Sequence, residues 1–213
     1  MKRLSMLIIL LSLGCNSRAQ GVLYEISEGR IEVDSTFVEQ TFSVSRSALD
    51  VSYSNTSTIN TSFGNLRIEF GNDSMEYEYG FNIINIHLDG TCLMGIKQYD
   101  LWTYMFNGRS MIDFSRFTEN RYCIPINLAT DLSLIICCGW PYGGELPLLT
   151  VIAITSENAE VVYNRHVEIQ SLSKNPFEML VQTNLVEYLE NGTPLGREQR
   201  HKIYYKDGKL IYE

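Results

Sequence analysis

The stretch from Asp131 to Thr155 constrains the fold of this chain more than any other. It reads DLSLIICCGWPYGGELPLLTVIAIT and is the most apolar run that follows the first twenty residues. Its centre carries the turn-forming residues Gly139, Pro141, Gly143 and Gly144. Short apolar runs on both sides of a turn, rich in branched side chains, are typical of buried strands. We therefore predict two buried strands at the centre of a sheet, joined by an aromatic, glycine-rich loop.

Adjacent cysteines, Cys137 and Cys138, lie in the first of these strands. Successive side chains of a strand point to opposite faces of its sheet, so we expect one sulfur on each face and a strand that is covered on both sides. The cysteines available for a disulfide are Cys92, Cys123, Cys137 and Cys138. A bond from Cys92 or Cys123 to one of the adjacent pair is one alternative. The other alternative, which we favour, is that all four cysteines are free and pack as small hydrophobic residues.

The rest of the chain shows short alternating segments separated by turn signals, at spacings near ten residues. Strands are predicted at 22–26, 30–34, 37–44, 66–70, 75–79, 81–88, 91–96, 160–164, 166–169, 200–205 and 209–212. Two of the turns between them are hairpin signals, Asp89-Gly90 and Asp207-Gly208. Residues 179–189 fit either a helix or a strand.

Three further segments refine this picture. Residues 50–62 are almost wholly Ser, Thr and Asn, which indicates an exposed loop or a polar edge hairpin. Pro125 restricts residues 122–128 to an edge strand or a loop. Ser110–Asn120 is the best helix candidate. The fold class expected is mainly β, an antiparallel β-sandwich or barrel-like meander with at most one or two short helices.

The first twenty residues have the pattern of an export signal. Met1-Lys2-Arg3 precedes an apolar segment, Leu4–Leu13, which is too short to span a bilayer and matches a secretory signal peptide. Cleavage before Gln20 would remove residues 1–19 and leave a single β-rich domain at 20–213. The sequence SLGC, ending at Cys15, also resembles a bacterial lipobox, although Ser12 stands where Leu is usual. In that alternative residues 1–14 are removed and Cys15 carries a lipid.

In these twenty residues and in its β-rich character, the chain resembles exported bacterial envelope proteins and lipoproteins. The resemblance implies a place in the cell envelope, as an outer-membrane lipoprotein or as a periplasmic or secreted protein. No other apolar run reaches spanning length, so no transmembrane span is expected in the mature chain.

Charge and motifs exclude several functions. The formal net charge is -8 at pH 7, which disfavours binding to nucleic acid because the phosphate backbone would be repelled. The three histidines, His87, His166 and His201, are far apart and form no metal-binding motif. The G-x-S-x-G, Walker and dinucleotide motifs are also missing. We therefore predict no catalytic residue, metal or cofactor from local sequence.

The candidate site is the loop that joins the two central strands. Trp140 and Tyr142 stand next to glycines and could form an exposed aromatic platform, with Glu145 accepting hydrogen bonds from hydroxyl groups. The favoured alternative is a tight turn whose aromatic rings pack back onto the protein.

The function expected is that of a non-catalytic envelope binding protein with a glycan or another envelope protein as partner. An immunity or inhibitor protein is one version of that function. The alternative is a secreted or periplasmic hydrolase with dispersed Asp, Glu and His residues. Convergence of Glu145, His166 and Asp131 in one cleft would favour the hydrolase.

Overall fold

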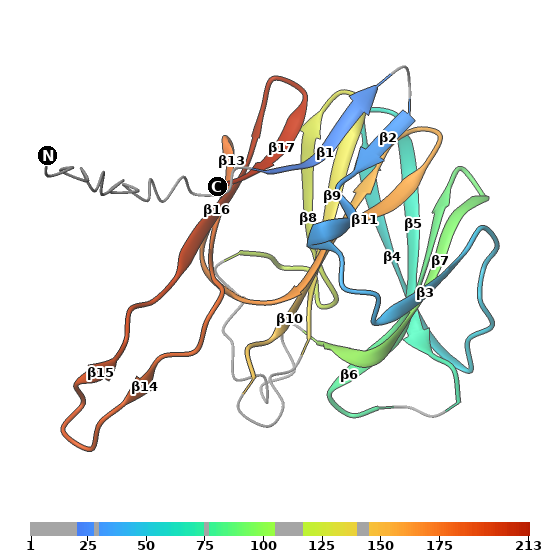
Figure 1. Ribbon diagram of the computed structural model, residues 1–213. Coiled ribbons are helices and arrows are strands. Elements are labelled where there is room, and N and C mark those ends of the chain that lie inside the picture. The colour runs from blue at the N-terminus through green and yellow to red at the C-terminus, as the bar shows by residue number, and fades with distance from the viewer. Residues whose placement is uncertain (1–20, 28–29, 75–76, 105–116, 140–144) are drawn as a thin grey trace, which may run out of the picture.

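Antiparallel strands stacked in three layers make up the computed structural model of the protein (Figure 1). The structure describes residues 21–27, 30–74, 77–104, 117–139 and 145–213. Within those ranges the only helical element is one 3₁₀ helix, η1 (Ser35–Phe37). The chain is therefore mainly β, as predicted.

Three large sheets and one small ribbon contain all the strands of the described residues. The central sheet has the order β11–β10–β9–β8 and consists of β8 (Ile124–Ala129), β9 (Leu132–Cys138), β10 (Leu148–Ile154) and β11 (Ala159–His166). The six-stranded sheet has the order β12–β13–β16–β17–β1–β2 and consists of β1 (Gly21–Ser27), β2 (Arg30–Val33), β12 (Glu168–Lys174), β13 (Phe177–Gln182), β16 (Arg200–Lys206) and β17 (Lys209–Tyr212). The five-stranded sheet has the order β3–β7–β6–β5–β4 and consists of β3 (Phe42–Ser45), β4 (Tyr53–Thr61), β5 (Gly64–Asn72), β6 (Gly80–Leu88) and β7 (Thr91–Thr103). The ribbon pairs β14 (Glu187–Tyr188) with β15 (Pro194–Leu195).

Each large sheet is open and has an edge strand on both sides. The sandwich alternative of the predicted fold class is therefore correct, and the barrel-like alternative is wrong. The sequence alone does not distinguish a sandwich from a barrel, because closure of a sheet into a barrel depends on pairing between strands that are distant in sequence.

The central sheet is covered on both faces. Every residue of β9 and β10 is buried. Leu134, Ile136 and Cys138 pack against the six-stranded sheet, whereas Ile135 and Cys137 pack against the five-stranded sheet. A strand that is buried on both faces has no polar face, so its sequence does not alternate. The predicted pair of buried central strands, with one cysteine on each face, is confirmed.

A chain of buried hydrogen bonds links the central sheet to the five-stranded sheet. The indole Nε1 of Trp102 on β7 donates to Thr150 Oγ1 at 2.9 Å, and that hydroxyl donates to Asn164 Oδ1 at 2.7 Å. Asn164 Nδ2 then donates to the carbonyl oxygen of Glu39 at 2.7 Å and to Thr41 Oγ1 at 2.9 Å. Trp102, Thr150 and Asn164 are completely buried. This network satisfies polar groups that would otherwise be costly inside the core.

The other turn and edge predictions mostly agree with the structure. The polar tract at 50–62 contains β4, an edge strand, and Pro125 lies on β8, also an edge strand. Asp89 and Gly90 both have positive φ, of 47° and 88°, as a two-residue hairpin turn requires. The alternative of a strand in residues 179–189 is correct as far as Gln182, where β13 ends, and again at Glu187–Tyr188, which form β14.

Three strand predictions are wrong. Residues 166–169 do not form one strand, because β11 ends at His166 and β12 begins at Glu168. Residues 37–44 do not form one strand, because Asp34 caps η1 by accepting a hydrogen bond from Thr36 N at 3.0 Å, and β3 begins only at Phe42. Of the predicted strand at 75–79, residues 75–76 lie outside the described residues, Tyr77 has no regular structure, and Glu78 and Tyr79 form a bend. There the Asp73 carboxylate accepts a hydrogen bond from Asn82 Nδ2 at 3.3 Å, which closes a loop. Of the predicted helix, residues 110–116 lie outside the described residues, and Phe117–Asn120 are not helical.

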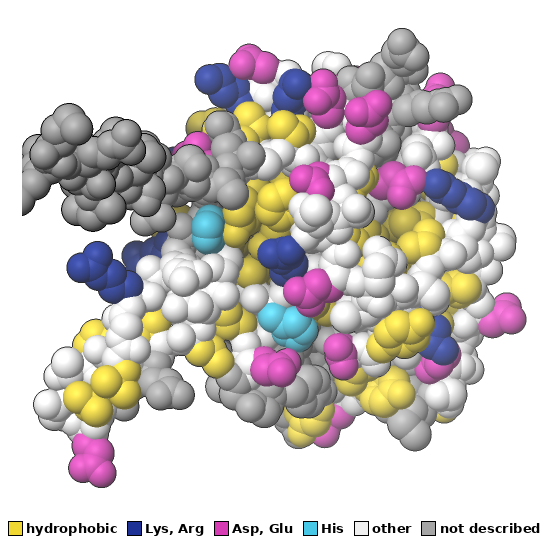
Figure 2. Space-filling view, viewed as in Figure 1, with side chains coloured by type: hydrophobic (Ala, Val, Ile, Leu, Met, Phe, Trp, Pro, Cys, Tyr) yellow, Lys and Arg dark blue, Asp and Glu magenta, His cyan; other side chains and the backbone are white. Residues whose placement is uncertain are grey.

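A long hairpin that carries β14 and β15 projects from the body between β13 and β16 (Figure 1). Leu185, Leu189 and Leu195 are each about half exposed on it, with exposed fractions of 55%, 47% and 54%. Figure 2 shows hydrophobic side chains along this projection. No helix in the described part of the chain has the length and apolar character to cross a membrane.

Candidate functional site

The loop that the sequence singled out is described only at its end. Trp140 and Tyr142 lie outside the described residues, as does Cys15. Glu145 is exposed. The next residue, Leu146, is buried, and its carbonyl oxygen lies 2.9 Å from Nδ1 of His166.

The three residues proposed for a hydrolase do not come together. Glu145 and His166 lie near the end of the central sheet where β9 ends and β10 begins. Asp131 lies at the other end, immediately before β9. There burial raises the pKa of Tyr24 and Tyr205, and the charge of Asp131 adds to the rise. The seven residues of β9 separate the two ends, which corresponds to roughly 20 Å along a strand.

All four cysteines outside the first twenty residues are free thiols. Cys123, Cys137 and Cys138 are buried, and burial raises the pKa of each thiol, to about 12 for Cys138. Thiols with such pKa values stay protonated at neutral pH and are poor nucleophiles and poor metal ligands. No group of three or more His, Cys, Asp and Glu side chains in the described ranges is placed to hold a metal ion.

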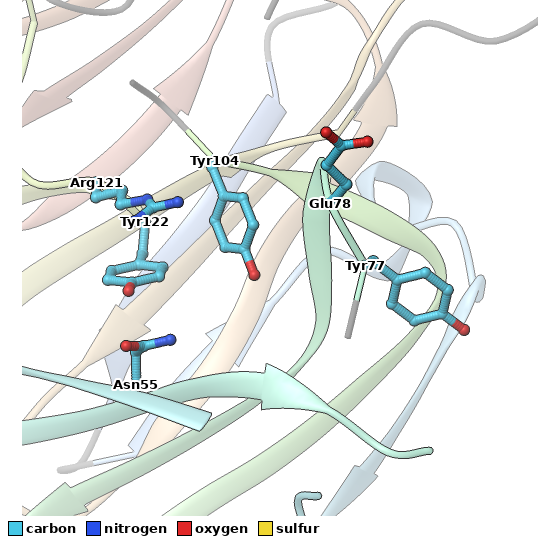
Figure 3. Close-up of a pocket in the computed structure, with 6 residues that line it drawn as sticks. All are labelled: Asn55, Tyr77, Glu78, Tyr104, Arg121 and Tyr122. Atoms are coloured by element: carbon cyan, nitrogen blue, oxygen red, sulfur yellow. The ribbon is translucent and has the colours of Figure 1, made fainter. Parts of the chain in front are cut away.

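A pocket of about 490 Å³ opens where four separate segments meet beside the five-stranded sheet. Its lining consists of Asn55, Tyr77, Glu78, Tyr104, Arg121 and Tyr122. We call this set the tyrosine pocket. Asn55 lies on β4, Tyr77 and Glu78 precede β6, Tyr104 follows β7, and Arg121 and Tyr122 precede β8. In Figure 3, Tyr104 lies between the Arg121–Tyr122 pair and the Tyr77–Glu78 pair, with Asn55 close to the Tyr122 ring.

Aromatic packing fixes the floor of the tyrosine pocket. The Tyr122 ring stacks on Phe70 with a centroid distance of 4.8 Å and an interplanar angle of 10°. It meets Tyr104 edge to face at 5.8 Å, and both tyrosines contact Phe81. Burial raises the pKa of the Tyr122 hydroxyl, although the charge of Arg121 opposes the shift. That hydroxyl is therefore protonated at neutral pH and can donate a hydrogen bond.

A tight turn holds the Arg121–Tyr122 pair in place. Asn120 Oδ1 accepts hydrogen bonds from the backbone N–H of Tyr122 at 2.8 Å and of Cys123 at 3.1 Å. The amide nitrogen of Asn120 donates to Ser57 Oγ on β4 at 2.8 Å. The turn is thus tied to the strand that carries Asn55, so the two sides of the pocket are fixed relative to each other.

Charged groups complete the pocket rim. The guanidinium carbon of Arg121 lies 4.8 Å from the centroid of the Tyr104 ring, a cation–π distance. Glu78 contributes the opposite charge, and both side chains are exposed. The described lining of the tyrosine pocket therefore contains tyrosine rings, an amide, a guanidinium and a carboxylate, and no aliphatic side chain. Of these rings, that of Tyr104 is buried.

Sequence reasoning missed this site. Its residues come from four segments spread between positions 55 and 122, and no local motif joins them. The abundance of tyrosine, 13 in the chain, was the only signal that pointed toward it. Glu145 is not among the residues that line it.

Comparison of the chain with protein-family models, with curated proteins and with solved structures finds no match.

Proposed function

We propose that this protein is an exported, non-catalytic binding protein of the bacterial cell envelope, and that the tyrosine pocket binds a glycan. The observation that carries the proposal is the composition of the lining, which combines tyrosine rings with planar polar side chains. The signal-like pattern of the first twenty residues supports the envelope location.

A sugar ring matches this combination of groups. One side of the ring presents C–H groups that pack on an aromatic face, and its edge presents hydroxyls that both donate and accept hydrogen bonds. The Asn55 amide can do both, the Arg121 guanidinium donates, and the Glu78 carboxylate accepts. The volume of about 490 Å³ lies within the range usual for small-molecule sites.

The carboxylate content favours binding over hydrolysis. Glycoside hydrolysis normally requires two carboxyl groups that flank the scissile bond. Glu78 is the only carboxylate among the described residues that line the tyrosine pocket. Among the described lining residues, a ligand held there would meet one carboxylate and no second one that could act as its catalytic partner.

A glycan array tests the proposal, with Asn55→Ala as the variant and Asn60→Ala as its matched control. Both asparagines are exposed on β4. Because successive residues of a strand point to opposite faces, Asn55 and Asn60 lie on opposite faces of β4. Asn55→Ala should weaken retention of the bound glycan about fivefold or more, because about 1 kcal/mol of hydrogen bonding is lost. Asn60→Ala should bind like the unchanged protein.

The array also shows how the proposal would fail. If the unchanged protein retains no glycan, the proposed function is wrong. If a glycan is retained equally by the unchanged protein, by Asn55→Ala and by Arg121→Ala, the protein binds glycans at another site.

A further inference from the structure

The outer edge of β3 carries backbone groups that no other strand of the described chain pairs with. Within the described chain β3 pairs only with β7, and it forms one edge of the five-stranded sheet. The N–H of Tyr99 donates to the carbonyl oxygen of Thr41 at 3.0 Å. In an antiparallel pair, every second residue directs its N–H and C=O groups to the partner strand. Since Thr41 bonds to β7, Ser43 does so as well. Phe42 and Val44 therefore direct their N–H and C=O groups outward, away from β7.

A groove of about 240 Å³ lies beside this edge. Its apolar lining consists of Val33, Val38, Phe42, Val44 and Val161. It lies among the edge strands of all three large sheets, β2, β11 and β3. We call this the edge groove. Val44 is 48% exposed, so the apolar surface is open to solvent at the β3 side.

A segment of the chain itself pairs with a neighbouring sheet edge, that of β11. Val38 forms an isolated parallel bridge with Asn164 on β11, and the N–H of Glu39 donates to the carbonyl oxygen of Asn164 at 2.9 Å. This segment covers the edge of β11 at that point. Among the described residues, no backbone hydrogen bond joins this segment to the outward groups of Phe42 and Val44.

We propose that the outer edge of β3 accepts an extended peptide segment of a protein partner by strand addition. The peptide backbone would pair with the outward N–H and C=O groups of Phe42 and Val44, and its alternate side chains would enter the edge groove. A peptide backbone supplies donors and acceptors at the strand spacing that these groups require. The groove alone is smaller than a usual small-molecule site, which also favours a segment that gains its affinity from backbone pairing.

The charges around the edge groove define the peptide further. The nearby cation, Arg46, is already paired with Glu160 at 2.7 Å and bonded to Asn158. Glu39 is exposed between two residues that line the groove, Val38 and Gln40. The expected segment therefore has apolar side chains at alternate positions and a Lys or Arg next to them. This binding is independent of the tyrosine pocket.

The test is an NMR titration of the ¹⁵N-labelled protein with a panel of capped pentapeptides of the form Lys-X-Thr-Z-Lys, in which X and Z are Val, Ile, Leu or Phe. At least one peptide should cause saturable shifts of the Phe42 and Val44 amide signals at millimolar concentration. Val44→Pro should weaken that binding about tenfold or more, because it removes an outward N–H. Val44→Thr keeps this N–H and should bind within a few-fold of the unchanged protein.

Stability measurements separate loss of binding from loss of fold. Val44→Pro should keep a melting temperature close to that of the unchanged protein, because the missing N–H does not pair with β7. Ser43→Pro removes an N–H from the β3–β7 pairing and should lower the melting temperature. The proposal is overturned if no peptide of the panel shifts these signals saturably, or if Val44→Pro binds as well as Val44→Thr.

Discussion

Thr150 is the residue whose replacement tests the packing between the central and five-stranded sheets most sharply. Its hydroxyl accepts from Trp102 Nε1 at 2.9 Å and donates to Asn164 Oδ1 at 2.7 Å, and all three side chains are fully buried. Thr150→Val keeps the shape of the side chain and removes both hydrogen bonds. Thr150→Ser keeps the hydroxyl and removes one methyl group.

The two variants should differ measurably in stability. Thr150→Val leaves a buried donor on Trp102 and a buried acceptor on Asn164 without this partner, and each such loss costs about 1–3 kcal/mol. We expect a net loss of about 3 kcal/mol, a large part of the 5–15 kcal/mol typical of a folded domain. Thr150→Ser should cost about 1 kcal/mol for the lost methyl group. The difference of about 2 kcal/mol corresponds to roughly thirtyfold in the unfolding equilibrium.

Urea unfolding followed by far-UV circular dichroism and by tryptophan fluorescence measures this difference. The dependence of the unfolding free energy on urea should be the same for both variants, because the exposed surface changes little. If Thr150→Val is as stable as Thr150→Ser, the hydroxyl does not connect the two sheets and our description of the buried network is wrong.

Three further changes have defined outcomes. Gly80→Ala should lower the unfolding free energy by about 1–3 kcal/mol, because an added Cβ would lie 2.1 Å from the carbonyl oxygen of Trp102; an unchanged urea midpoint would contradict this close approach. The pKa of Asp73 is lowered to about 2 by its hydrogen bonds with Lys97 and Asn82, so its stabilising effect is complete above the unfolded pKa near 4 and is lost as the pH falls toward 2. Asp73→Asn should therefore flatten the fall of the urea midpoint between those pH values. An identical pH profile in both proteins would count against the ion pair of Asp73 with Lys97, whose atoms Oδ2 and Nζ lie 2.6 Å apart. Replacing residues 185–197 of the projecting hairpin with an Asn-Gly turn should change the unfolding free energy by less than about 0.5 kcal/mol, since its leucines are exposed; a larger loss in urea unfolding would place the hairpin in the core.

The sequence predicts those parts of the fold that depend on local patterns. The two mostly apolar runs at 132–138 and 148–154 identify strands buried on both faces, and adjacent Cys137 and Cys138 show that both faces must be covered. Pro125 marks an edge strand, and Asp89-Gly90 marks a hairpin, because both effects are local to the backbone.

The layer arrangement depends on long-range pairing, which no local pattern encodes. The six-stranded sheet joins β1 and β2 from the start of the described chain to β12, β13, β16 and β17 from its end. The tyrosine pocket also depends on contacts between segments that are distant in sequence. Asn55 sits in a polar tract that predicts only an exposed edge, and Tyr104 and Tyr122 come near each other only because β7 and the turn before β8 pack together.

The most direct test of the proposed function is to map where a retained glycan binds. An NMR titration of the ¹⁵N-labelled protein with the strongest glycan from the array should shift the amide signals of Asn55, Arg121 and Tyr122 most. These residues line the tyrosine pocket. Shifts concentrated at Glu145 and its neighbours, with Asn55 and Tyr122 unchanged, would contradict the assignment and would place the site at the loop between the two central strands.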